Sequence, residues 1–160
     1  MVENRPPIER PLKPRTLVLM AGHIGDAVHK MVAGEIRWVR QHDYLAGDAS
    51  MLAARAIIEF LVGRSSARRE RDIWPEDYRA AWRVEDAEAT LLREWLGVID
   101  GRLAHLSLRR ADEPSDPPER WHDTVVRLLQ LMRRFADEIA EQPGHDQLVI
   151  PLNNAEALLA

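Results

Sequence analysis

Polar side chains set within apolar stretches are the residues of this sequence that could do chemistry. Arg55 and Glu59 lie four positions apart in a run of alanine, isoleucine and leucine, so on a helix they share one face and can pair. His105 and Arg109 have the same separation in a later leucine-rich stretch. If both stretches are helices that pack together, these four side chains would meet in a polar pocket between them.

Asp72 or Asp77, from the segment between the two stretches, is expected to join this pocket. Two hypotheses account for the group. It is either a satisfied structural network that fixes the register of the helices, or a site in which His105 works with the arginines and Glu59. In a ribonuclease the imidazole would activate the RNA 2′-hydroxyl and an arginine would stabilise the phosphorane.

His23, Asp26 and His29 recur at every third position and could be considered as metal ligands. On a helix the outer two side chains would point about 120° apart, which makes a shared ion difficult to hold. We interpret them as polar residues on the outer face of a helix, and we expect no metal and no cofactor.

Composition narrows the class of protein. The chain has 160 residues, enough for one domain, a net charge of −4 and no cysteine. The absent cysteines exclude disulfides, thiolate chemistry and sulfur-ligated metals, and they fit a cytoplasmic protein. The longest early apolar run, Leu17 to Ala21, is too short to span a membrane, so no membrane association is expected. Nucleic-acid binding is possible through the arginine-rich residues 64–71, but the net charge does not favour it.

Apolar residues recur mostly at steps of three and four, which predicts an all-α fold. The prediction is a helical bundle of four long helices and one short helix, with a break in the first helix near Gly22 or Gly25. Asp48 is predicted to cap the second helix after a loop, and Gly97 and Gly101 to mark a close helix approach or a bend. The predicted helices cover 16–41, 49–62, 74–78, 84–108 and 119–141, between a proline-rich arm, 1–15, and an extended tail; the bundle as a whole is 16–142 and the tail 143–160.

Three motifs in order resemble a family of small, mostly uncharacterised bacterial helical proteins. They are Ala-Arg-Ala-Ile-Ile-Glu-Phe-Leu from Ala54, Asp72-Ile73 with Asp77-Tyr78, and Leu-Ala-His-Leu-Ser-Leu-Arg from Leu103. In that family a His often precedes the Ala-Arg pair, whereas this chain has Ala53 there. The resemblance implies a helical bundle and draws attention to the polar positions, and it carries no assigned reaction.

The leading hypothesis for function is a non-enzymatic interaction or regulatory module that self-associates or joins a complex. The proline-rich arm, the apolar tail segment from Leu148 to Leu152 and the five tryptophans favour it. One alternative is a ribonuclease-like protein of a toxin or phage-defence system. Such nucleases carry an Arg shortly before a His on one helix, and here Arg102 is only three residues before His105. A third hypothesis is a small-ligand sensor lined by Trp74, Trp82, Trp95 and Trp121.

Overall fold

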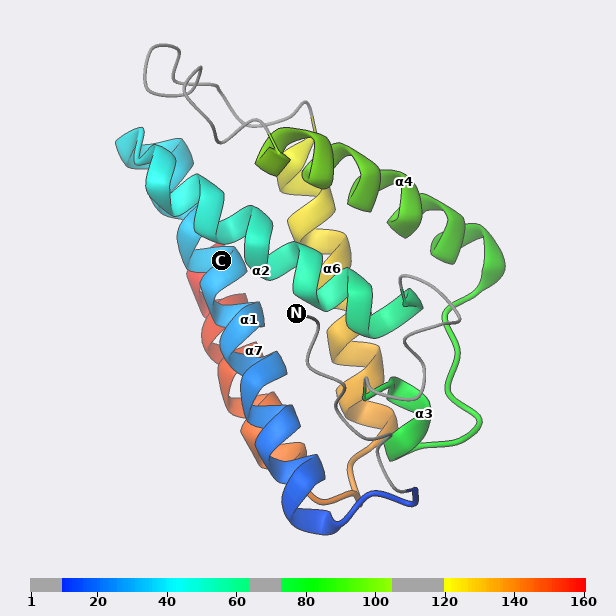
Figure 1. The fold of residues 1–160 in the computed structure, drawn as a ribbon. Coiled ribbons are helices and arrows are strands. Elements are labelled where there is room, and N and C mark those ends of the chain that lie inside the picture. The colour runs from blue at the N-terminus through cyan, green and yellow to red at the C-terminus, as the bar shows by residue number, and fades with distance from the viewer. Residues whose placement is uncertain (1–9, 64–72, 105–119) are drawn as a thin grey trace, which may run out of the picture.

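All the regular structure in the described part of the chain is helical, as predicted. The computed structural model describes residues 10–63, 73–104 and 120–160. Figure 1 shows the helices gathered into one bundle. The helices are α1 (Pro14–Gln41), α2 (Tyr44–Val62), α3 (Pro75–Tyr78), α4 (Asp86–Ala104), α6 (Trp121–Glu138) and α7 (His145–Leu159).

Helix α1 ends at Gln41 as predicted, but it begins two residues before its predicted start and has no break. Pro14 is in its first turn, where a backbone N–H has no hydrogen-bond partner within the helix, so the N–H that proline lacks is not needed. At the other end His42 adopts a left-handed conformation with φ 52°, and the N–H of the next residue, Asp43, donates to the carbonyl of Arg37. The helix continues through Gly22 and Gly25 because its inward stripe is apolar on both sides of them: Leu17, Ala21, Ile24, Val28 and Met31 are all buried.

Helix α2 begins five residues before its predicted start. Asp43, rather than Asp48, caps it by accepting a hydrogen bond from the N–H of Ala46 at 3.0 Å. The residues predicted to form a loop are the first turn of the helix, and Ala46 and Gly47 are buried there. Gly47 is a poor helix former, but it lets the ring of Trp38 on α1 come close to the backbone.

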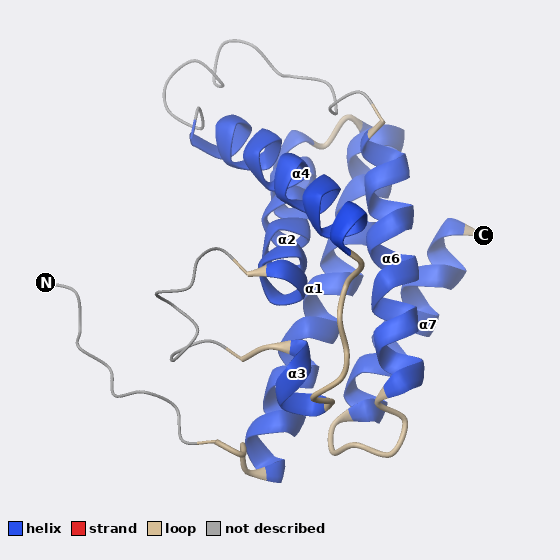
Figure 2. Cartoon of the chain, turned by 90° about the vertical axis from the view of Figure 1, so that its right-hand side faces the viewer, coloured by secondary structure: helices blue, strands red, loops and turns tan. Residues whose placement is uncertain are grey.

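Helix α2 packs on α1 along one side and on α4 along the other, while α7 covers the opposite side of α1. Figure 2 shows α6 and α7 side by side on the remaining face. Between α2, α3 and α6, the rings of Phe60, Tyr78, Trp82 and Phe135 pack edge to face around Phe135, with centroids 5.1–5.5 Å from it. This cluster fixes the short helix α3 against the bundle.

The C-terminal segment is a helix, so the prediction of an extended tail is wrong. Leu148 and Leu152 are one turn apart and fully buried, whereas Ile150 between them is 61% exposed. The apolar segment from Leu148 to Leu152 is therefore part of a helix, with Leu148 and Leu152 on its buried face and Ile150 on its exposed face. Pro151 lies within α7, and its ring faces Gly25 of α1, where a Cβ would come within 2.9 Å of the ring. The missing side chain of Gly25 thus allows α7 to approach α1.

The other predicted helices lie close to their expected positions. The fourth is α4, and its predicted last residues, 105–108, lie outside the described residues. Among residues 10–63, 73–104 and 120–160, no atom lies within 4 Å of where a Cβ of Gly97 or Gly101 would be, so these residues show no close approach of another helix there. At the start of the described chain, Arg10 binds Asp77 of α3 through two hydrogen bonds of 2.6 and 3.3 Å. This contact attaches the end of the arm to the bundle.

Substituting Gly47 by Ala should destabilise the protein, because the new Cβ would lie 2.3–2.6 Å from ring atoms of Trp38. The expected loss in the free energy of unfolding is about 1–3 kcal/mol. Gly97→Ala is the matched control, since it adds the same atom to a helix with open space around it, and it should stabilise by about 0.5–1 kcal/mol. Urea unfolding of both variants measures this. Equal effects of the two substitutions would contradict the close α1–α2 packing.

Candidate functional site

The predicted polar group is only partly assembled in the structure. Arg55 and Glu59 pair across one turn of α2, with Nε to Oε1 at 3.1 Å, as their spacing indicates. The same Nε lies 3.0 Å from a carboxylate oxygen of Asp100 on α4. Asp100 was missed because its partner comes from another helix, and sequence spacing alone does not show which faces meet. Arg55 is therefore an ionic link between α2 and α4.

The remaining predicted members are elsewhere or outside the described residues. Asp77 lies in α3, where it binds Arg10 and accepts from the N–H of Trp74 at 2.9 Å, so its expected place beside Arg55 is wrong. The physical reason is local, because a carboxylate in the first turn of a helix satisfies the free backbone donors there. His105, Arg109 and Asp72, like the arginine-rich residues 64–71, lie outside the described residues.

The contact between Arg55 and Asp100 should show measurable energetic coupling. Both side chains are partly exposed, at 29% and 41%, so we expect a coupling free energy of about 0.5–1 kcal/mol. A double-mutant cycle with Arg55→Met and Asp100→Asn, followed by urea unfolding, measures it. The Arg55–Glu59 pair within α2 provides the comparison, at about 0.3–0.5 kcal/mol. Additive effects of the Arg55 and Asp100 substitutions would show that the two helices are not joined there.

A second polar pair, missed from the sequence, lies between α1 and α6. The Glu35 side chain is only 3% exposed, and Nδ1 of His122 lies 2.7 Å from its Oε1. Burial raises the pKa of Glu35, and the hydrogen bond to His122 opposes that rise. Ile24, Val28 and Met31 on the buried face of α1 are spaced four and three residues apart, and the next step of four reaches position 35. This spacing could have predicted from the sequence that the Glu35 carboxylate is buried.

Replacing Glu35 by Gln should change how stability depends on pH. Because the folded-state pKa lies above the ordinary 4.5, the folded protein holds this proton more tightly than the unfolded chain. The contribution of Glu35 to stability therefore falls as pH rises from about 4.5 towards the folded-state pKa. The stability of Glu35→Gln relative to the wild type should accordingly increase between about pH 4 and pH 7 in urea unfolding.

The comparison variant is His122→Ala. It removes both the hydrogen bond and the electrostatic attraction by which His122 lowers the pKa of Glu35. It should shift the pH interval over which Glu35 titrates further upward. A difference between Glu35→Gln and the wild type that stays constant with pH would contradict the raised pKa.

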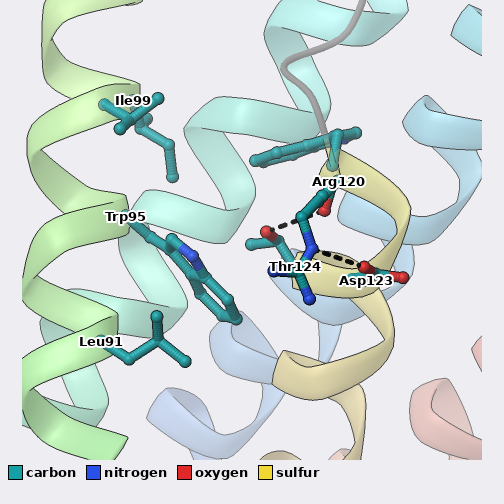
Figure 3. A pocket seen from close by; sticks show the side chains of 8 residues that line it. Leu91, Trp95, Ile99, Arg120, Asp123 and Thr124 are labelled. Atoms are coloured by element: carbon teal, nitrogen blue, oxygen red, sulfur yellow. Dashed lines mark hydrogen bonds and ion pairs between the residues drawn. The ribbon is translucent and has the colours of Figure 1, made fainter.

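A cavity of about 190 Å³ lies between α4 and the start of α6. Figure 3 shows Leu91, Trp95 and Ile99 along α4, facing the first turn of α6 across it. Leu91 and Val98 are 37% and 50% exposed, so the cavity is open to solvent along its α4 side. We call it the α4–α6 groove, lined by Leu91, Trp95, Val98, Ile99, Arg120, Trp121, Asp123 and Thr124.

Polar groups lie on the α6 side of the α4–α6 groove. Arg120 has φ 62° and directly precedes α6, and its Nε lies 3.0 Å from Oδ2 of Asp123. Its carbonyl accepts from the hydroxyl of Thr124 at 3.3 Å. The groove thus combines an apolar wall with a short polar edge that carries both signs of charge.

Ion pairs hold α4 to α6 elsewhere along their contact. The buried carboxylate of Glu88 on α4 pairs with Arg127 and, at 3.5 Å, with Arg134, both on α6. On its other side α4 is tied to α2 by the contact between Asp100 and Arg55. These links fix the spacing of α4 and α6, and hence the width of the α4–α6 groove.

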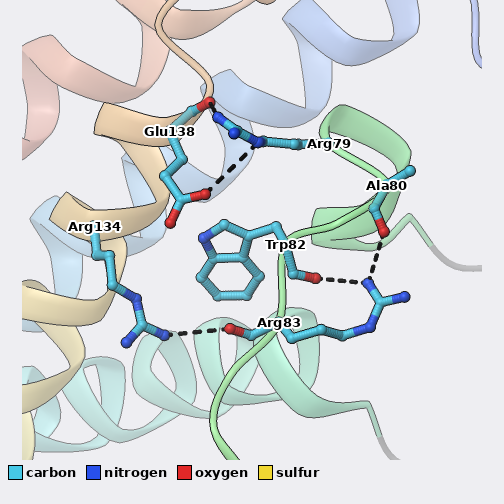
Figure 4. Close-up of polar contacts among 6 residues, drawn as sticks. All are labelled: Arg79, Ala80, Trp82, Arg83, Arg134 and Glu138. Carbon is cyan, nitrogen blue, oxygen red and sulfur yellow. Dashed lines mark hydrogen bonds and ion pairs between the residues drawn. The ribbon is translucent and has the colours of Figure 1, made fainter.

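A second cavity, of about 230 Å³, lies near Trp82, between the ends of α2 and α4. Arginines surround the buried indole of Trp82 (Figure 4). Arg134 lies over its ring at 5.5 Å, Arg83 donates to its carbonyl at 2.6 Å, and Arg79 pairs with Glu138 beside it. The arginines bind backbone carbonyls and carboxylates, which gives them a structural role.

The tryptophans proposed to line one sensor pocket are distributed over different places. Trp95 and Trp121 line the α4–α6 groove, whereas Trp82 lines the second cavity. Trp74 packs over Gly63, where a Cβ would lie 2.5 Å from its ring. The ring of Trp121 also packs against Trp38 of α1, with centroids 6.4 Å apart. The two tryptophans that share a cavity are therefore Trp95 and Trp121.

His23, Asp26 and His29 are exposed on α1, as interpreted from the sequence, and Asp26 pairs with Lys30 at 2.6 Å. Within residues 10–63, 73–104 and 120–160, no three histidine or acidic side chains gather as a possible metal site. None of the helices in these ranges has the length and apolar character needed to cross a membrane.

Comparisons with protein-family models, curated proteins and solved structures give no significant match.

Proposed function

We propose that the protein is an interaction module that binds a helix of a partner protein through the α4–α6 groove. The observation that carries this proposal is the row formed by exposed Leu91, half-buried Trp95 and exposed Val98 on α4, spaced four and three residues apart beside an open cavity. That spacing suits a second helix lying alongside α4, because apolar residues of two helices interlock at these intervals.

The size of the α4–α6 groove favours a side chain over a metabolite as its occupant. Small-molecule sites usually enclose roughly 300–1,000 Å³, whereas this groove offers about 190 Å³ and is open along one side. A large apolar side chain from the partner helix fits such a space. Trp95, which is half-buried, would provide much of the contact, as aromatic residues commonly do at binding hot spots, whereas Trp121 lines the groove but is only 4% exposed.

The polar edge of the groove would orient the partner. Arg120 and Asp123 lie next to the apolar wall and present a cation and an anion at the first turn of α6. Binding surfaces generally combine an apolar centre with such a polar rim. A partner helix with a large apolar anchor and a polar flank on the α6 side is the occupant that this arrangement supports.

The alternative functions have less support from the described residues. The ribonuclease hypothesis requires His105 and Arg109, which lie outside them, and Arg55 is engaged by Asp100 and Glu59. The sensor hypothesis requires one cavity with four tryptophans, and the α4–α6 groove has two.

Selection of amphipathic helical peptides from a phage-displayed library tests the proposal. Enriched peptides should carry a large apolar residue whose substitution by Ala weakens binding tenfold or more, which corresponds to about 1.4 kcal/mol. The variant Val98→Glu should lose this binding, because it places a charge on the apolar wall. Val39→Glu is the matched control, since Val39 lies on α1 and is similarly exposed, at 55% against 50%.

Peptide binding can be measured by fluorescence anisotropy with each variant, and circular dichroism checks that both remain folded. If the selected peptides bind Val98→Glu as tightly as the wild type, or if no apolar anchor emerges, the α4–α6 groove is not the binding surface.

A further inference from the structure

Helix α2 exposes a second apolar surface, on the side facing away from the bundle. Leu45 and Leu52 are 82% and 48% exposed, and Ala49 and Ala56 are exposed with them. These residues are spaced four, three and four apart, which is the interval of a helix–helix seam. We call this set, Leu45, Ala49, Leu52 and Ala56, the outer α2 stripe.

We propose that the outer α2 stripe binds the same stripe of a second copy of the chain, with the two helices antiparallel about a two-fold axis. In this arrangement Leu45 faces Ala56 of the second copy, and Ala49 faces its Leu52. Each layer then pairs one large with one small side chain, and symmetry repeats every contact. A parallel pair would instead place leucine against leucine and alanine against alanine.

The charges beside the outer α2 stripe favour the same orientation. Asp48 and Arg55 flank it on one side, seven residues apart, so they occupy equivalent positions of successive heptads. An antiparallel second copy brings its Asp48 towards Arg55, because equivalent flanking positions face each other across an antiparallel pair. A parallel copy would place them on opposite sides of the seam, so the two charges could not pair. Arg55 is 29% exposed and already binds Glu59 and Asp100, so Asp48 of the second copy would add to an existing ionic network.

The length of the outer α2 stripe sets the strength of the association. It extends over about three helical turns, or roughly 17 Å. A contact of this length belongs with the smaller, transient interfaces, so we expect a reversible dimer with a Kd on the order of 10–100 µM. This dimerisation does not depend on the proposed function, because it uses α2 rather than the α4–α6 groove.

Sedimentation velocity of the full chain, over concentrations on either side of that Kd, tests the proposal. The wild type should shift from monomer to dimer as its concentration rises. Leu52→Glu should remain monomeric, whereas Leu19→Glu, at a similarly exposed leucine of α1, should dimerise like the wild type. Ala49→Glu repeats the test at a second position, and circular dichroism confirms that each variant is folded.

Disulfide cross-linking tests the orientation, and the chain has no cysteine that would complicate it. An equimolar mixture of Leu45→Cys and Ala56→Cys should form the mixed disulfide in preference to either homodimer, which mass spectrometry distinguishes. Predominant homodimer cross-links would overturn the antiparallel arrangement. A monomer at every concentration, or a dimer unaffected by both Leu52→Glu and Ala49→Glu, would overturn the proposed surface.

Discussion

The bundle leaves part of the surface of each helix uncovered, and on α2 and α4 the uncovered part also carries apolar residues. One face of α4 contributes Leu92, Leu96 and Ile99 to the core, while Leu91 and Val98 remain exposed. Helix α2 buries most of its length and still exposes Leu45 and Leu52. Apolar surface left in water is costly, at roughly 25 cal/mol per Å². Both proposed surfaces follow from this excess of apolar residues.

Buried and partly buried charges determine where α4 lies. Glu88 is almost fully buried, and its negative charge is balanced by Arg127 and Arg134 of α6. Removing one partner of a buried pair leaves an uncompensated charge, so such a contact defines one arrangement of the helices more sharply than apolar packing does. The Arg55–Asp100 contact adds a second fixed point on the α2 side. The groove between α4 and α6 keeps its shape because both neighbours constrain α4.

The all-α fold and most helix positions could be predicted from sequence because they depend on the local spacing of apolar residues. The errors arose where a tertiary contact overrides a local signal. The start of α2 depends on the burial of Ala46 and Gly47 against α1, and the helical conformation of residues 145–159 depends on Leu148 and Leu152 docking on the bundle. Neither contact is visible in a short stretch of sequence.

The candidate site was harder to predict than the fold. The Arg55–Glu59 pair lies within one helix and was correctly identified, whereas Asp100 and the Glu35–His122 pair join different helices. Trp95 and Trp121 share a cavity only because α4 and α6 are held side by side.

The central claim is that the outer faces of α2 and α4 are accessible apolar surfaces in the isolated chain. Paramagnetic relaxation of side-chain methyl signals by a soluble gadolinium complex, measured on the dilute monomer, tests it most directly. The methyl groups of Leu45, Leu52 and Val98 should be broadened about as strongly as those of exposed Leu19, while those of buried Leu128 are spared. Protection of these methyl groups equal to that of Leu128 would contradict the account.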